Sequence, residues 1–226
     1  MNRSFARAVF ALTVAAAALS ARAQQLYSFE DGTQGFGPNG FPVPTVAQDT
    51  VGATSGTHSL LFGLGQTQTF SGALTQTVNQ ATLLSPSTTA IAVDVTVPQG
   101  AGEYTGAGFA NMGITFFGAI PSQGVFGVPV QTNAASERNV DLAPGTYTLV
   151  IPLVATNGAP MRNAFGTGAG QFTDLSGLQF YISKSGDDDM TVYLDNVRAV
   201  PEPATAALAC AAGLGLVATR RRRAAR

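Results

Sequence analysis

Few side chains in this sequence are of the types that catalyse hydrolysis or group transfer. The chain holds one histidine, His58, and one cysteine, Cys210, which lies in an apolar run near the C-terminus. No Gly-x-Ser-x-Gly elbow is present, so no serine nucleophile of that kind has a candidate. His58 stands at the start of an expected strand, where a surface or pairing role is the usual one. We therefore expect neither a serine nor a cysteine nucleophile with a histidine base.

Carboxylates are the remaining candidates for acid–base chemistry. A glycosidase needs two of them facing each other across a cleft. Glu30, Glu103, Glu137 and the aspartates are numerous enough, but their spacing selects no pair. Asp187, Asp188 and Asp189 favour a solvated hairpin turn over an ion site. We expect a protein that is not an enzyme, with a glycan-cleaving enzyme as the alternative.

The N-terminus has the layout of a secretory signal peptide. Arg3 and Arg7 precede an apolar stretch from Ala8 to Leu19, and Ala21-Arg22-Ala23 supplies a small-x-small cleavage site. Cleavage after Ala23 would make Gln24 the first mature residue. The alternative, a buried N-terminal helix, explains neither the charged start nor the cleavage site.

The C-terminus combines a proline pair, an apolar run and an arginine block. The apolar run covers residues 204–219, about 24 Å as a helix against about 30 Å of hydrocarbon, so we expect a short and marginal transmembrane segment. The alternative is a soluble amphipathic helix, but the run has no polar face. Arg220–Arg223 follow directly, and such clusters stay on the cytoplasmic side. The prolines on both sides of Glu202 keep that segment extended.

These features together resemble the PEP-CTERM sorting signal of Gram-negative bacteria, here over residues 200–226. The matching parts are Pro201-Glu202-Pro203, one short hydrophobic span and a terminal arginine cluster. The resemblance implies an exosortase, a membrane cysteine protease-transpeptidase, that processes the chain at or near Pro201, Glu202 and Pro203. It also implies export through an inner-membrane intermediate to the cell surface or extracellular matrix, where family members are associated with polysaccharide and biofilm.

Between these two ends the chain is acidic. All 13 Asp and Glu residues lie between Glu30 and Glu202, with only four basic residues in the same span, a net charge of −9. Nucleic-acid binding rests on clusters of Lys and Arg, so this class of partner is excluded. The span has no cysteine, so an exported domain must be held by its core or by a metal.

Residues 24–199 read as one all-β domain. Short alternating or β-branched runs are separated by Gly, Pro, Asn and Ser, and no helical period is sustained. The clearest run is Ala90–Val97, with its valines and Ile91 on one face. We expect an antiparallel β-sandwich of jelly-roll type. The expected strands are Leu26–Phe29, His58–Leu64, Ala73–Val78, Ala90–Val97, Phe109–Phe117, Val125–Val130, Thr146–Leu153, Leu178–Ser183 and Thr191–Arg198.

Three short motifs resemble jelly-roll modules related to carbohydrate-binding domains. They are Phe29-Glu30-Asp31-Gly32, Gly56-x-x-Ser59-Leu60 and Asp195-Asn196-Val197. Many sugar-binding members stack exposed tryptophans on the sugar ring, and this chain has none. Tyr104, Phe116, Phe117 and Phe126 are the aromatics on or beside glycine-flanked strands, where we expect core packing, with stacking as the alternative.

The same resemblance implies a structural Ca²⁺ that joins the first strand to the last. The matching residues are Glu30, with Asp31, and Asp195, with carbonyls near Thr57 and Ser59. Carboxylate and carbonyl oxygens are the ligands that Ca²⁺ prefers. The alternative is that Glu30 and Asp31 cap a turn while Asp195 accepts hydrogen bonds from a neighbouring loop.

Taken together, the sequence predicts an exported, non-catalytic surface or matrix protein. We expect an extracellular polysaccharide and an exosortase as its partners, with a transient membrane contact through the C-terminal helix. The open alternatives are a cell-surface enzyme that cleaves glycans and a purely structural matrix protein without a specific ligand.

Overall fold

The computed structural model describes residues 23–40, 43–66, 70–98, 110–120, 124–130, 145–154, 159–167, 171–184 and 189–201. Residues 24–200 form one compact unit. The segments assigned from sequence to the signal peptide and to the sorting signal beyond Pro201 lie outside the described residues. Within the described residues, no helix has the length and apolar character needed to cross a membrane.

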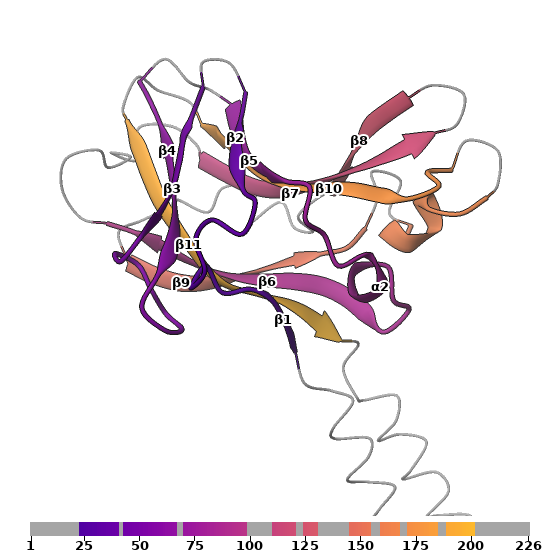
Figure 1. Cartoon of the computed structure of the whole chain (residues 1–226), viewed down its shortest axis with the longest axis horizontal. Coiled ribbons are helices and arrows are strands. Elements are labelled where there is room, and N and C mark those ends of the chain that lie inside the picture. The colour runs from indigo at the N-terminus through magenta and orange to yellow at the C-terminus, as the bar shows by residue number, and fades with distance from the viewer. Residues whose placement is uncertain are drawn as a thin grey trace, which may run out of the picture. The chain divides into compact units, whose positions relative to one another are not determined.

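The unit consists of two β-sheets that lie one above the other (Figure 1). Every strand pairing with a described register is antiparallel, so the predicted antiparallel β-sandwich is confirmed. Sheet A has the order β3-β4-β11-β6-β9, with β1 also paired to β11. Its strands are β1 (Gln24–Tyr27), β3 (Thr45–Asp49), β4 (Ser59–Leu64), β6 (Thr88–Val97), β9 (Gly145–Pro152) and β11 (Met190–Pro201).

Sheet B has the order β2-β5-β10-β7-β8. Its strands are β2 (Gly37–Asn39), β5 (Phe70–Thr75), β7 (Ala110–Ile120), β8 (Gly124–Val130) and β10 (Leu175–Lys184). Two short helical turns complete the described elements, α2 (Gln80–Leu83) and the 3₁₀ turn η2 (Met161–Ala164). Asn79 caps α2, because its side chain accepts a hydrogen bond from the Thr82 N–H.

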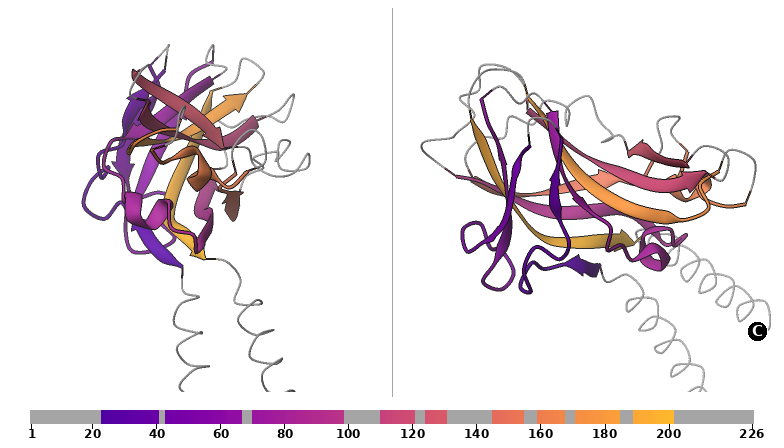
Figure 2. Two further views of the ribbon diagram at one scale, coloured as in Figure 1. Left: turned by 90° about the vertical axis from the view of Figure 1, so that its right-hand side faces the viewer. Right: turned by 45° about the horizontal axis from the view of Figure 1, so that its top comes forward.

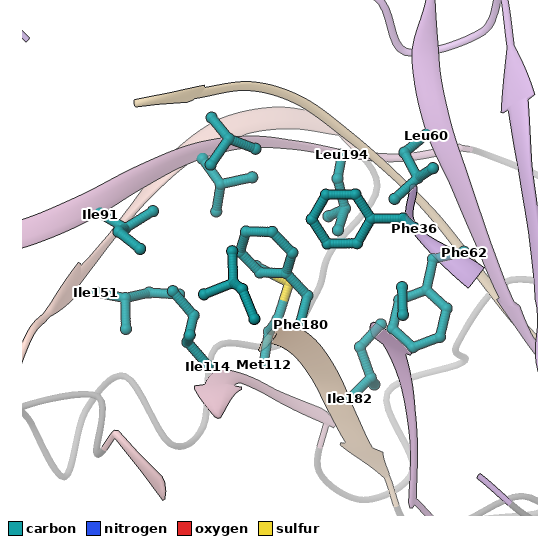
Figure 3. Close-up of a cluster of buried hydrophobic side chains, with 14 of the residues drawn as sticks. Phe36, Leu60, Phe62, Ile91, Met112, Ile114, Ile151, Phe180, Ile182 and Leu194 are labelled. Carbon is teal, nitrogen blue, oxygen red and sulfur yellow. The ribbon is translucent and has the colours of Figure 1, made fainter. Parts of the chain in front are cut away.

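Alternation along the strands builds the apolar layer between the sheets. In β10, Leu178, Phe180 and Ile182 are fully buried, while the residues between them face away from sheet A. Ile91, Val93 and Val95 supply the matching face from β6. Figure 3 shows several of these side chains in the space between the sheets, with Phe180 beside Ile114, its partner in the register of β10 with β7. The core members lie between Tyr27 and Val197, so residues 24–200 bring their own core.

An aromatic cluster ties the N-terminal segment into this core. The Phe36 ring lies 5.0 Å from Tyr27, 5.7 Å from Phe29 and 5.8 Å from Phe180 between ring centroids. The first two contacts are edge-on and the third is stacked, geometries that aromatic pairs prefer. The segment before β2 is therefore packed against sheet B, although β1 belongs to sheet A.

The first and last strands of the unit lie side by side. In the register of β1 with β11, Gln24 is opposite Ala199 and Gln25 is opposite Arg198. The two strands keep this arrangement in all views (Figures 1 and 2). The two ends of the unit therefore pair with each other in sheet A.

Some sequence expectations were wrong in detail. The residues Lys184–Asp189 do not join a hairpin, because β10 lies in sheet B and β11 in sheet A. Strand β5 begins at Phe70, three residues before the expected start, and β2 and β3 were missed. Both missed strands are short edge strands with little alternation, so their signal in the sequence is weak.

Candidate functional site

The predicted metal residue Asp195 holds a loop against the outer face of sheet A. The side chain is fully buried. Its Oδ2 accepts hydrogen bonds from the N–H groups of Thr54 at 2.6 Å and Ser55 at 2.7 Å, and lies 3.0 Å from the Thr54 hydroxyl. Thr54 belongs to the loop of residues 50–58 that joins β3 to β4. The last strand thereby fixes a loop about 140 residues earlier in the chain.

Glu30 holds the other end of the same loop. Its Oε1 accepts the N–H groups of Thr57 at 2.9 Å and His58 at 2.8 Å, and its Oε2 accepts the Thr57 hydroxyl at 3.0 Å. The backbone N–H groups of His58 and Thr57 favour the charged carboxylate, so they lower the pKa of Glu30 to about 2. The side chain remains about one-third exposed.

His58, the one histidine, takes part in this contact. Its Nδ1 lies 2.9 Å from the Thr57 hydroxyl and 3.5 Å from Glu30 Oε2. The ring is half-buried and sits at the end of the loop that Glu30 anchors. Its position fits the pairing role expected from the sequence.

A bulge in β11 explains why Asp195 and Asn196 act together. Leu194 and Val197 are both buried in the core, with two residues between them instead of one. Asn196 has a φ of 48°, in the left-handed region that asparagine tolerates better than most residues. The extra residue lets Asp195 reach the loop while the Asn196 amide donates to Asp94 Oδ2 at 2.9 Å.

Asp94 of β6 is the centre of the polar network on this face. Its carboxylate accepts from the Thr148 hydroxyl at 2.6 Å, from Arg198 at 3.1 Å, and from the Thr54 hydroxyl at 2.9 Å. Burial raises the pKa of Asp94, but its hydrogen bonds outweigh burial, so the pKa lies below the usual value. The described carboxylate oxygens here are all occupied, which marks the network as structural.

The donors around Glu30 and Asp195 fit the loop-anchoring alternative better than a calcium ion. A Ca²⁺ ligand must turn a free oxygen lone pair toward the ion, whereas the oxygens of both side chains face N–H or O–H groups. Asp31 is exposed in the turn that follows Glu30. Among the described residues, no group of three or more His, Cys, Asp or Glu side chains could hold a metal. The calcium ion stays a prediction.

The outer face of sheet B is different in character. Its five strands carry one charged residue, Lys184, which is buried. Tyr181 of β10 points away from the core, since its neighbours Phe180 and Ile182 point into it. Phe70 of β5 lies beside Tyr181 with ring centroids 5.2 Å apart, and half of Phe70 is exposed. Two aromatic rings thus share an uncharged surface.

Two glycines let the side chains of β10 lie flat on this face. Tyr181 stands opposite Gly72 of β5 on one side and opposite Gly113 of β7 on the other. A Cβ at Gly113 would overlap the Tyr181 ring, and a Cβ at Gly72 would overlap the Gln179 side chain. Glycine in a strand interior marks a close approach of this kind. We call Phe70, Gly72, Gly113, Gln179 and Tyr181 the Tyr181 face.

Polar groups and a hollow border the Tyr181 face. The buried Oδ1 of Asn111, next along β7, has no hydrogen-bond donor within the described part of the chain. Leu74 of β5 lines a hollow of about 360 Å³, together with Gly35, Gly37 and Pro38 around the start of β2 and with Gln76 and Thr77 just after β5. The five residues from Phe70 to Leu74 extend over about 13 Å, four steps along the strand, enough for an elongated ligand.

The aromatics singled out from the sequence lie elsewhere. Phe116 is buried in the core, and Phe117 is half-buried on the outer side of β7. Tyr104 and the side chain of Phe126 lie outside the described residues. Tyr181 was missed because its position over Gly113 depends on strand pairing, and only the apolar–polar alternation of residues 178–183 pointed to its outward direction.

Comparison with known proteins gives matches only among solved structures. The chain matches no protein-family model and no curated protein sequence. One similar structure is of carbohydrate-binding modules from the β-sandwich superfamily, with 14% identity and a TM-score of 0.49. The match covers 76% of this chain but only 60% of that one.

Two further structures have similar values. The C-terminal family 22 carbohydrate-binding module of Clostridium thermocellum Xyn10B has 15% identity and a TM-score of 0.45, covering 79% of this chain and 93% of that one. The family 11 module of Clostridium thermocellum Lic26A-Cel5E has 12% identity and a TM-score of 0.46, covering 80% and 95%. At this similarity the ligand must be argued from the residues of the chain itself.

The pH dependence of stability in a Glu30 variant tests whether Glu30 anchors the loop of residues 50–58. Because the pKa of Glu30 falls from 4.5 to about 2 on folding, its contribution to stability is complete above pH 4.5 and is lost as the pH falls toward 2. Glu30→Gln should remove this part of the acid dependence in thermal melts, while the exposed Asp31→Asn should keep it. Equal pH profiles for Glu30→Gln and the unmodified protein would contradict the anchoring role. The same melts, repeated with calcium and with chelator, test the predicted calcium ion. If the ion is bound, chelator should lower the melting temperature of the unmodified protein, and Glu30→Gln should abolish this difference.

A double-mutant cycle tests the close approach of Tyr181 to Gly113. Gly113→Ala should cost about 1 kcal/mol of unfolding free energy, because the ring must be displaced. In a Tyr181→Ala background the same change should cost nothing. Gly63→Ala in β4 is the control, since a Cβ there would make only ordinary contacts at 3.5 Å or more. An unchanged cost of Gly113→Ala after removal of the ring would refute the geometry.

Proposed function

We propose that the protein is a non-catalytic, exported polysaccharide-binding protein and that the Tyr181 face holds the ligand. The observation that carries this proposal is the flat placement of Tyr181 over Gly113 with Phe70 beside it. Sugar rings present C–H groups to the faces of aromatic side chains. An aromatic side chain binds a sugar best when the protein already holds it in the binding position before the ligand arrives. Thr115 of β7 and Ser183 of β10, which are partly exposed on the same face, can exchange hydrogen bonds with sugar hydroxyls.

Charge favours a neutral glycan. The strands of sheet B hold no acidic residue and only the buried Lys184, and the span from Glu30 to Glu202 has a net charge of −9. Without cationic side chains to pair with carboxylates or sulfates, a polyanion would be repelled by this domain. The proposed ligand class is therefore an extended, uncharged polysaccharide.

The absence of acids from the strands of sheet B also favours binding over cleavage. Glycan hydrolysis needs two carboxyl groups at the ligand. The described carboxylates of Glu30, Asp94 and Asp195 are engaged with a loop or with the outer face of sheet A. The alternative of a glycan-cleaving enzyme would need a pair of carboxylates at the Tyr181 face.

Export and sorting form a separate part of the proposal, supported by the two ends of the sequence. The signal-peptide layout of residues 1–23 and the tail from Pro201-Glu202-Pro203 to the arginine cluster support release or transfer by an exosortase. The protein would then act at the cell surface or in the extracellular matrix. Extracellular polysaccharide would be present there as a ligand.

Loss of the aromatic rings tests the binding site. Tyr181→Ala and Phe70→Ala should each weaken binding to a responsive neutral polysaccharide by on the order of tenfold, about 1.4 kcal/mol. Affinity electrophoresis against a panel of neutral and acidic polysaccharides gives the measurement, with thermal melts as a check on folding. Val51→Ala is the control, because Val51 is exposed to nearly the same extent as Phe70, 47% against 50%, but lies in the loop of residues 50–58. Full binding by folded Tyr181→Ala, or no binding to any neutral polysaccharide, would overturn the assignment.

Mass spectrometry of the protein from its native host tests the sorting. The mature chain should begin at Gln24 or a neighbour and should lack Arg220–Arg226. If most molecules keep the arginine cluster, the exosortase is excluded and the tail is a simple membrane anchor.

A further inference from the structure

Strand β9 forms one edge of sheet A. It pairs with β6 along its whole length, from Gly145 opposite Val97 to Pro152 opposite Ala90. Within the described part of the chain, no strand pairs with its other side. Among the described strands, none takes up the alternate N–H and C=O groups on that side, which are of the kind that pair with another strand.

The other four edges among the described strands are short or blunted, whereas β9 is not. Strand β1, which pairs only with β11, has four residues. Strand β2 has three residues, including Pro38; β3 has five and ends at Asp49; and β8 contains Pro129. Short length, charge and proline are the devices by which proteins protect sheet edges. Strand β9 has eight residues, GTYTLVIP, with no charge and with proline only at the last position. Its β-branched and aromatic residues favour strand pairing.

The surface around this edge is compatible with a close neighbour. Thr146, Thr148 and Val150 are exposed on its outer face. The acidic group nearest to them in the register is Asp94, opposite Thr148, and Arg198 neutralises it at 3.1 Å. A strand that docks along β9 thus meets no uncompensated charge on β6 or β9.

We propose that the edge of β9 pairs antiparallel with the same edge of a second copy of this chain, so that two copies of sheet A form one continuous sheet. A second copy is favoured because a two-fold axis satisfies both open edges at once. A different protein would have to supply its own unprotected edge, which folded proteins rarely expose. The pairing leaves the Tyr181 face of each copy uncovered, because that face belongs to sheet B, and the proposal does not depend on the ligand.

The net charge of the domain gives the association a defined salt dependence. Two acidic copies repel each other through solvent, while the β9 strands themselves are uncharged. Between about 0.01 M and about 1 M salt the Debye length falls from about 30 Å to about 3 Å. Association should therefore strengthen as salt is added, the opposite of an interface held by ion pairs.

Sedimentation velocity of residues 24–200 over a concentration series tests the pairing. The unmodified protein should pass from monomer to dimer, and the dimer should form at lower concentration in high salt. Val150→Lys places a charge on the edge and should raise the dissociation constant at least about tenfold. Val51→Lys is the matched control, with 47% exposure against 48% for Val150 and a position in the loop of residues 50–58; it should leave the dimer intact.

Hydrogen exchange identifies the surface that pairs. The amides within residues 145–151 that point away from β6, and so are not bonded to it, should gain protection in the dimer relative to the monomer, and Val150→Lys should abolish that gain. A monomer at every concentration and salt level would overturn the proposal, as would a dimer that Val150→Lys and Val51→Lys affect equally. Protection of these amides in the monomer would show that another part of the chain already covers the edge, which also refutes it.

Discussion

The rest of the structure depends on the apolar layer between the two sheets. Residues 24–201 contain no cysteine, so burial of alternate side chains must hold the sheets together. Phe36, stacked on Phe180 and in edge contact with Tyr27 and Phe29, draws the N-terminal segment into this layer. Once alternate residues within β6 and within β10 are buried, the intervening residues of each strand must point to the outer face of its sheet.

Polar contacts then secure what the apolar layer cannot reach. Glu30 and Asp195 lie near the two ends of the unit, and both accept backbone N–H groups of the loop of residues 50–58. Three segments that are distant in sequence are thereby joined, a task that a disulfide performs in many exported domains. Asp195 is fully buried and needs such donors, because an unpaired buried charge would destabilise the fold.

The two outer faces differ because the residues between the buried positions differ. On sheet A these residues include Asp94, Asp195 and Arg198, and the described oxygens of both carboxylates accept hydrogen bonds within one network. On sheet B they include glycine, glutamine and tyrosine, which form a flat, uncharged surface. The proposed binding on sheet B and the proposed pairing at the β9 edge of sheet A use separate surfaces, so one molecule could do both at once.

The sequence alone determined the sandwich, its long strands and the acidic charge of the domain, because alternation and composition are local properties. It also singled out Glu30 and Asp195, although it left open whether they bind an ion or a loop. Tertiary structure decided that both carboxylates meet the same loop, that β10 and β11 lie in different sheets, and that Tyr181 rests over Gly113. Each of these depends on which strands become neighbours. Strand pairing joins residues far apart in the chain, and no local pattern records it.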